Sequence, residues 1–243
     1  MPILEGKGVT KHFGGLAAVS NVDFSVEQGE ALGLIGPNGA GKTTLFNLIS
    51  ASLAPSAGVI SLEGQTITGL KPHEICRMGV ARTFQTVKIF PDMPVLQNVV
   101  LGAFFGAAEK MNSAEVISNA MEILDFVGLS ALQSQPAKDL TLANQKRLEL
   151  ARALATNPEV LLLDEIMAGL TQTEVVQAMD LITRTRAKGI TIIMIEHVMR
   201  AIMNLCERIL VLHHGAMIAE GTPQEITSSK AVIEVYFGEK NTC

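Results

Sequence analysis

A glycine-rich loop directly after a short apolar run is the feature that most restricts the fold of this 243-residue chain. The run Ala31–Ile35 predicts a buried strand, and residues 36–43 fit the pattern G-x-x-x-x-G-K-T. Glycine lets the backbone curl so that successive N–H groups point at one phosphate chain. We therefore predict a nucleoside triphosphate site formed by Gly36, Pro37, Asn38, Gly39, Ala40, Gly41, Lys42, Thr43 and Thr44.

The residues at the end of this loop give it a specific chemistry. The side chain of Lys42 can reach the β- and γ-phosphates, and the hydroxyl of Thr43 can ligate Mg²⁺. A helix that begins at about Gly41 would direct its positive N-terminal end at the same anion. A glycine-rich turn that matches by chance is the alternative, but it leaves the preceding strand and the following helix unexplained.

The composition indicates a globular protein with a substantial core. Apolar residues make up 48% of the chain, and the formal net charge is −5. Because no basic stripe is present, nucleic acid is not an expected partner. The apolar run 99–108 falls far short of the roughly 18–20 residues that a membrane-spanning helix needs, and the first residues lack a signal peptide's apolar segment. The three scattered cysteines, Cys76, Cys206 and Cys243, indicate reduced thiols. The adjacent residues His213 and His214 indicate a turn rather than a metal site.

Strand patterns occur in both halves of the chain. Alternating apolar residues at 22–26 predict a strand with one buried face, and the continuous runs 160–163 and 190–195 predict strands buried on both faces. The segments 209–212 and 216–219 indicate a hairpin. Further elements are expected as a strand over 59–62, helices over 45–49 and 174–188, and a short helix that starts from a capping box at Thr222.

The middle of the chain has a different character. Strand patterns fade after about residue 90, while 111–126 and 145–154 show helical spacing of apolar residues. We therefore expect a single domain over 1–243, with a core from 1–89 and 156–243 and an inserted helical subdomain at about 90–155.

Acidic residues and a histidine follow two of the predicted buried strands. Asp164 ends the run 160–163 and has the placement of an acid that holds magnesium. Because adjacent strand residues point to opposite faces, the next residue, Glu165, can instead orient or deprotonate an attacking water. His197 follows the strand 190–195 at the sheet edge where ligands of α/β proteins bind, so it can contact a γ-phosphate. A solvated acidic pair and an incidental histidine are the alternatives.

Two further residues carry weaker signals. Gln85 lies where the core gives way to the helical segment, where it can sense the metal and transmit movement of that segment. Phe13 is one of few aromatic residues and is followed by two glycines, so it is either a core residue or a platform on which adenine stacks.

Taken together, these residues resemble the ATP-binding subunits of ABC transporters over essentially the whole chain. Residues 36–43 are similar to the Walker A motif and 161–165 to the Walker B motif with the catalytic glutamate, while Gln85, His197 and Phe13 are similar to the Q-loop, the switch histidine and the adenine-stacking aromatic. The resemblance implies an α/β P-loop NTPase with a mainly parallel core sheet, an antiparallel β subdomain and an inserted helical subdomain. It also implies ATP and Mg²⁺ as cofactors, with Thr43, Gln85 and Asp164 at the metal.

In that family two cassettes form a head-to-tail dimer with ATP between them, and a signature motif, usually Leu-Ser-Gly-Gly-Gln, completes the opposite site. Here the corresponding segment is 140–144, Leu-Thr-Leu-Ala-Asn, which loses both glycines. Thr141 keeps a hydroxyl, a backbone N–H at Ala143 can still donate to a phosphate, and the helix dipole remains. The segment 166–172 after the Walker B acids also departs from the family pattern, in the loop that normally contacts the opposite site.

Within the family, residues 11–19, 82–85, 168–170 and 235–238 are similar to the ATPases of branched-chain amino acid importers and their urea- and amide-transporting relatives. This implies a peripheral protein at the cytoplasmic face of the inner (plasma) membrane. Its implied partners are permease subunits, a second ABC ATPase in a homo- or heterodimer and, indirectly, an external solute-binding protein. A lipopolysaccharide-export ATPase, a soluble ABC ATPase of DNA repair or ribosomes, and a regulatory subunit with weak hydrolysis are the alternatives.

Overall fold

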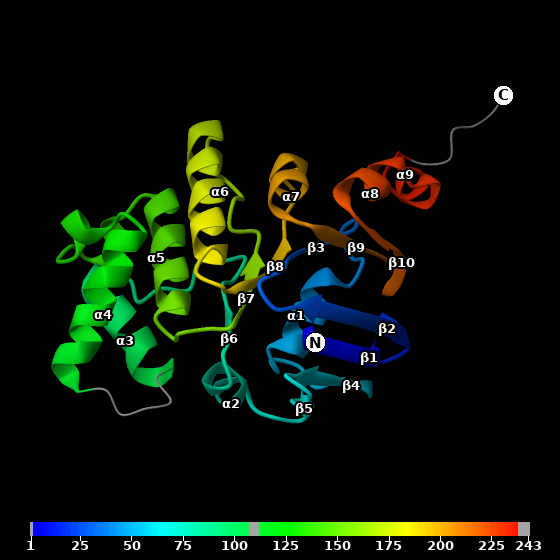
Figure 1. Ribbon diagram of the computed structural model, residues 1–243, viewed down its shortest axis with the longest axis horizontal. Helices are drawn as coiled ribbons and strands as arrows, with labels where there is room; N and C mark the ends of the chain where they lie inside the picture. Colours follow the sequence, from blue (N-terminus) through cyan, green and yellow to red (C-terminus); the bar gives the residue numbers. More distant parts are fainter. Residues whose placement is uncertain (1, 107–111, 238–243) are drawn as a thin grey trace.

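The computed structural model describes residues 2–106 and 112–237, whose strands form two sheets (Figure 1). In the first sheet, of order β10-β9-β3-β8-β7-β6, the pairs are parallel except for β9 with β10. Its strands are β3 (Ala31–Ile35), β6 (Val80–Arg82), β7 (Val160–Asp164), β8 (Thr191–Ile195), β9 (Arg208–His213) and β10 (Ala216–Gly221). The second sheet is antiparallel, with the order β2-β1-β4-β5 from β1 (Pro2–Phe13), β2 (Leu16–Glu27), β4 (Ala57–Leu62) and β5 (Gln65–Thr66).

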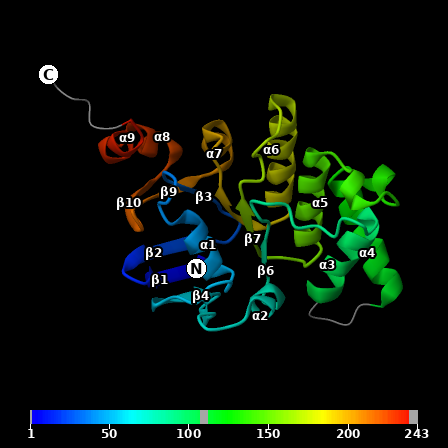
Figure 2. The ribbon, with the colours of Figure 1, turned by 180° about the vertical axis from the view of Figure 1, so that it is seen from behind.

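The helices fall into three regions, which Figures 1 and 2 show from opposite sides. The helix α1 (Lys42–Ile49) lies between the two sheets, with α2 (Pro72–Arg77) near β5 and β6. A helical group beyond β6 consists of α3 (Val95–Gly106), α4 (Ser113–Phe126), α5 (Leu142–Leu154) and the 3-10 turns η1 (Ser130–Leu132) and η2 (Ala137–Asp139). The other face of the parallel sheet carries α6 (Gln172–Arg186), α7 (Met199–Leu205), α8 (Pro223–Ser228) and α9 (Lys230–Phe237).

The parallel strands are buried on both faces, as their continuous apolar runs predict. In β7, Leu161 and Leu163 join the apolar cluster that extends over α5, α6 and α7. Leu162 points the opposite way and joins the cluster with α1 and the antiparallel sheet. Because helices or a second sheet cover each face, no polar alternation appears in these strands.

Most predicted elements are confirmed. The hairpin of β9 and β10 turns at His214, whose φ is 47°, and the short helix α8 starts from a capping box between Thr222 and Glu225. The expected α/β architecture, with a mainly parallel sheet and a separate antiparallel sheet, is also confirmed. The apolar run at 99–108 lies in α3 up to Gly106, and residues 107–108, Met111, Gly238 and Cys243 lie outside the described residues. No helix in the described part of the chain is long and apolar enough to cross a membrane.

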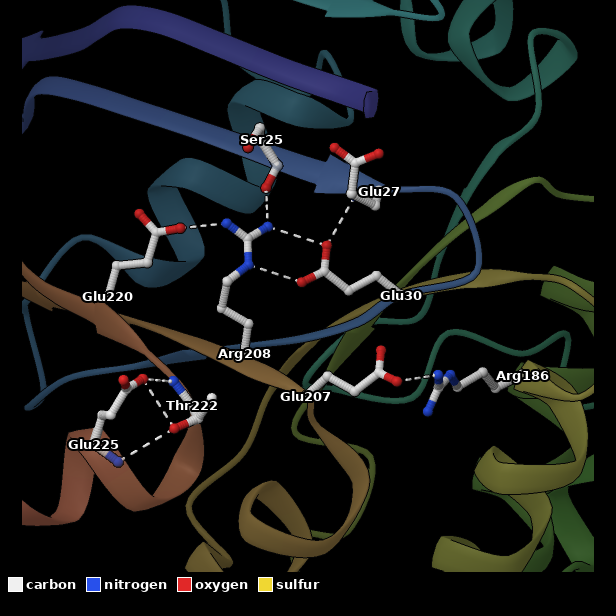
Figure 3. A network of polar contacts seen from close by, with 9 residues as sticks. All are labelled: Ser25, Glu27, Glu30, Arg186, Glu207, Arg208, Glu220, Thr222 and Glu225. Carbon is white, nitrogen blue, oxygen red and sulfur yellow. Dashed lines mark hydrogen bonds and ion pairs between the residues drawn. The ribbon is translucent and has the colours of Figure 1, made fainter. Parts of the chain in front are cut away.

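An arginine-centred network joins the two sheets at the edge opposite the phosphate loop (Figure 3). Arg208, the first residue of β9, donates from Nε to Glu30 over 2.8 Å and also to the carbonyl oxygen of Ser25 in β2. Glu220 of β10 pairs with the same guanidinium. The network therefore fixes β2 against the amino ends of β3 and β9. The phosphate loop lies at the opposite, carboxyl end of β3.

Candidate functional site: a phosphate-binding loop beside a held carboxylate

A cavity of about 310 Å³ opens beside the loop that joins β3 to α1. Loop residues 38–44 line it together with two predicted residues that lie far away in sequence, Gln85 and Glu165. The segment 16–18 of β2 and His214 complete the lining, and sequence reasoning missed them. They come close because the Gly215 N–H donates to the Ala40 carbonyl over 3.0 Å, a backbone contact that carries no sequence signal.

Two glycines permit the curl of this loop. Gly36 has φ 150°, and a Cβ there would lie 2.1 Å from the carbonyl oxygen of Leu212. Gly41, the residue before α1, has φ 105°, and its Cβ would lie 2.3 Å from the carbonyl oxygen of Ala18. At both positions a side chain would collide with a backbone carbonyl oxygen, which cannot move aside as a flexible side chain can. Both the positive φ and the close approach of a neighbouring backbone segment therefore require glycine.

Lys42 lies inside the loop rather than in solvent. Its side chain is buried, and Nζ donates to the carbonyl oxygens of Gly36 over 2.7 Å and Pro37 over 3.0 Å. Burial lowers the pKa of Lys42, and the nearby charges of Glu165 and Asp164 oppose that shift. The ammonium group is therefore held at the loop's centre, where a phosphate would replace the carbonyl contacts.

Three predicted residues meet at one carboxylate. Gln85 Nε2 donates to Oε2 of Glu165 over 2.9 Å, and His197 Nε2 lies 2.9 Å from Oε1 of the same residue. The expectation that strand alternation separates Glu165 from Asp164 is wrong, because Glu165 lies just beyond β7 with φ 50°. A left-handed residue turns the chain and aims the carboxylate at the cavity, and for a residue other than glycine that conformation is strained.

Asp164 occupies a different environment. Only 1% of its surface is exposed, and Oδ2 accepts a hydrogen bond from Arg82 Nη2 over 2.7 Å. Its other oxygen, Oδ1, is buried and has no hydrogen-bond partner among the described residues. A buried anionic oxygen without a donor is suited to a cation, so the donor set fits the predicted magnesium ion. No sequence pattern indicated the Arg82 contact, which depends on the pairing of β6 with β7.

Several predicted residues are not among those that line this cavity: Gly36, Pro37, Asp164, His197, Phe13, Thr141 and Ala143. Phe13 is half-exposed where β1 turns into β2, and the Lys11 ammonium nitrogen lies 5.3 Å from the centre of its ring. Thr141 caps α5, because its hydroxyl accepts from the Asn144 N–H over 3.4 Å. Ala143 lies in the first turn of that helix.

A phosphate loop after the first parallel strand, beside a carboxylate held by glutamine and histidine, defines a P-loop ATPase. Residues 19–168 match the ABC transporter family model, and residues 216–240 match that of the branched-chain amino acid ATP-binding cassette transporter. The chain therefore belongs to the ABC transporter ATP-binding family, and it is an ATP-hydrolysing ABC-type cassette.

Curated relatives are similar over almost the full length. The chain is 39% identical to the high-affinity branched-chain amino acid transport ATP-binding proteins BraF of Pseudomonas aeruginosa and LivG of Escherichia coli K12, with 98% of each chain covered. Among solved structures, the ADP conformation of MJ1267, an ATP-binding cassette of an ABC transporter, has a TM-score of 0.89 at 33% identity and covers 98% of this chain and 100% of its own. A dimeric structure of the bacterial ABC transporter cassette MJ0796 has a TM-score of 0.82 at 26% identity. The match covers 90% of this chain and 98% of the MJ0796 chain.

Proposed function

We propose that this chain is the ATP-binding and ATP-hydrolysing subunit of an importer for branched-chain amino acids or a related small polar solute such as urea or an amide. The match of residues 216–240 to the branched-chain amino acid cassette model is the observation that carries the substrate class. The full-length similarity to BraF and LivG supports it.

Different residues of the site have different roles in ATP hydrolysis in this proposal. The loop N–H groups and Lys42 bind the β- and γ-phosphates, because they converge on one cavity. Glu165 orients the attacking water and accepts its proton, while Gln85 and His197 hold that carboxylate from two sides. Thr43, Gln85 and Asp164 would hold Mg²⁺, which when bound neutralises charge on the phosphate oxygens.

A second cassette completes the site in this proposal. The N-terminus of α5 presents Thr141 and the Ala143 N–H away from the chain's own loop, with the helix dipole favouring an anion. The similar dimeric cassette structure supports such a pairing. The partner is a second copy or a different ABC ATPase, and loss of both signature glycines makes a partner with the usual signature the better opposing subunit.

We further propose that 90–155 acts as an inserted helical subdomain on the core formed by 1–89 and 156–243. Its helices α3, α4 and α5 pack on one another, and their apolar cluster continues into the parallel sheet. A groove of about 660 Å³ lies between this group and β6, and Phe84, Phe90 and Phe105 are among its lining residues. Because Phe84 directly precedes Gln85, an occupant of the groove can act on the catalytic carboxylate.

We assign this groove to a cytoplasmic segment of the permease. Phe105 is 64% exposed at its wall, which is a large apolar exposure for a surface that stays in water. The chain would then be a peripheral protein on the cytoplasmic face of the membrane, with an external solute-binding protein delivering substrate. Phe105→Asp is expected to abolish co-purification with the permease and to leave ATP binding unchanged.

The catalytic assignment is tested in the assembled transporter. Glu165→Gln is expected to lower ATP hydrolysis at least 100-fold while nucleotide affinity stays within about twofold, because the amide keeps the shape but accepts no proton. Glu63→Gln is the matched control, because this exposed residue lies in the turn between β4 and β5 and does not line the loop cavity. Equal activity after Glu165→Gln would identify a regulatory subunit whose partner does the hydrolysis.

The substrate class is tested by the partners. Co-purification should identify the permease and the external binding protein, and isothermal titration of that binding protein should show tight binding of leucine, isoleucine, valine, urea or a small amide. Recovery of an export complex that carries lipopolysaccharide would overturn the importer assignment.

A further inference from the structure

Two buried charges on one helix are not explained by nucleotide binding. Lys146 and Glu149 lie three residues apart on α5, and each is only 5% exposed. At that spacing both side chains lie on the same face of the helix. A buried ion is costly unless hydrogen bonds satisfy it, so the partners of these two residues indicate what they do.

Lys146 contacts the backbone of the catalytic carboxylate residue. Its Nζ donates to the carbonyl oxygen of Glu165 over 2.9 Å, and the Glu165 N–H donates to the Ile195 carbonyl over 2.9 Å. Both polar groups of this strained, left-handed residue are therefore fixed from outside its own segment. Lys146 thus holds the backbone of Glu165 in the orientation that directs the carboxylate oxygens Oε1 and Oε2 at the cavity.

Glu149 holds the loop that carries Gln85. Its Oε1 accepts from the N–H groups of Phe84 over 3.3 Å and Lys88 over 3.0 Å, on either side of that glutamine. Gln85 in turn donates to Glu165 over 2.9 Å. The contacts close a ring that runs from α5 through Lys146, Glu165 and Gln85 back to Glu149.

We propose that Lys146 and Glu149 are positioning residues that couple the α5 helix to the catalytic pair Glu165 and Gln85. A shift of α5 would move both groups together, because each is attached to the same helix face by a buried charged side chain. This inference rests on the proposed function, in which the N-terminus of α5 serves the opposite ATP. In the dimer, α5 of one subunit would contact the ATP bound by its partner. A shift of that helix would then move the catalytic carboxylate in the helix's own subunit.

The test uses the assembled transporter with wild-type chain, Lys146→Met, Lys146→Arg, Glu149→Leu and Glu149→Gln. Lys146→Met and Glu149→Leu are expected to lower kcat for ATP hydrolysis about tenfold or more, as loss of about 1.4 kcal/mol of transition-state stabilisation does, with KM and nucleotide affinity within twofold. Lys146→Arg keeps a charged donor and Glu149→Gln keeps an acceptor, so each is expected to recover most of the rate. Lys138→Met and Glu122→Gln, exposed in the same helical group, are the matched controls.

A second readout separates positioning from general loss of structure. Hydrogen exchange of the full chain should show faster exchange for the amides of residues 84–88 in Glu149→Leu, but not in Glu149→Gln, with unchanged protection in β8 and β9. Equal kcat in Lys146→Met and its control, or a parallel loss of nucleotide affinity, would overturn the inference. A Glu165→Gln transporter that hydrolyses ATP at the wild-type rate would instead overturn the proposed function.

Discussion

The guanidinium of Arg82 and the carboxylate of Asp164 form a nearly dry ion pair, with Nη2 and Oδ2 2.7 Å apart and side chains 7% and 1% exposed. Arg82 also donates to Asn47 Oδ1 over 2.6 Å and to Ser50 Oγ over 3.2 Å, both near the end of α1. One buried side chain therefore connects the predicted metal-binding acid to the helix that follows the phosphate loop. The ion pair orients Oδ2 of Asp164 and leaves its Oδ1 without a hydrogen-bond partner among the described residues, so Oδ1 can bind a cation.

Replacing Arg82 by methionine is expected to destabilise the fold by about 3–5 kcal/mol, because the Asp164 carboxylate stays buried without its counter-charge. Chemical denaturation followed by circular dichroism measures the loss. Arg77→Met, an exposed arginine at the end of α2, is the control and should change stability by less than about 0.5 kcal/mol. Equal stability of the two variants would contradict the role of the pair.

The loop geometry predicts different effects at two neighbouring glycines. Gly41→Ala places a Cβ 2.3 Å from the Ala18 carbonyl oxygen, whereas a Cβ at Gly39 has no heavy atom within 4 Å. Both residues have positive φ, so each alanine is strained by about 1 kcal/mol, and only Gly41→Ala adds a backbone clash. We expect nucleotide affinity to fall more than about tenfold for Gly41→Ala and a few-fold for Gly39→Ala. Binding of a fluorescent ATP analogue measures both, and a reversed order would contradict the geometry.

His197→Ala is expected to lower the hydrolysis rate by roughly 100-fold, because one of the two side chains that hold the Glu165 carboxylate is removed. Nucleotide affinity should stay within about twofold, since the phosphate loop is untouched. Steady-state hydrolysis and equilibrium binding together separate these effects. The control is His73→Ala on the exposed side of α2, and a loss of affinity as large as the loss of rate would argue against a role in holding the carboxylate.

Phe13→Ala tests the stacking role separately from the phosphate contacts. Loss of a half-exposed ring that stacks on adenine should weaken ATP binding by roughly 1 kcal/mol, or about fivefold. Binding of inorganic triphosphate, which has no base, should be unchanged. Competition titrations with the two ligands supply the measurement, and equal weakening for both would show that Phe13 acts through the loop.

Glu196 predicts a pH dependence of stability. Burial raises its pKa from 4.5 to about 7, while the hydrogen bond from the Met167 N–H and the charge of Lys146 oppose the shift. The folded protein therefore binds more protons than the unfolded chain between about pH 4.5 and 7, so this group lowers the free energy of unfolding as pH rises through that range. Below pH 4.5 the penalty is absent, and above pH 7 it is complete.

Glu196→Gln removes this titration and keeps an oxygen for the Met167 N–H. Relative to wild type, the variant should gain up to about 3 kcal/mol of stability between pH 4.5 and 8, at about 1.4 kcal/mol per pKa unit. Urea denaturation at several pH values measures the difference. A constant difference across the range would contradict a raised pKa, and Glu122→Gln on α4 should follow the wild-type curve.

Local sequence patterns determined much of this protein. The phosphate loop, the strands buried on both faces, the capping box of α8 and the hairpin of β9 and β10 depend on neighbouring residues, so periodicity and turn chemistry predict them. The identity and order of Lys42, Asp164, Glu165 and His197 also indicated a triphosphate site, because each follows a predicted strand or loop at the same sheet edge.

Tertiary structure decided how those residues work together. Strand order places β6 beside β7, and only this pairing brings Arg82 to Asp164 across 82 residues of sequence. The left-handed backbone of Glu165 and its contacts with Gln85 and His197 depend on three separate segments. The buried charges of α5 likewise find their partners only when the helical group packs on the sheet. Long-range hydrogen bonds leave no periodic signal in a chain, so the sequence indicated the candidate catalytic residues and the packing of the fold set their geometry.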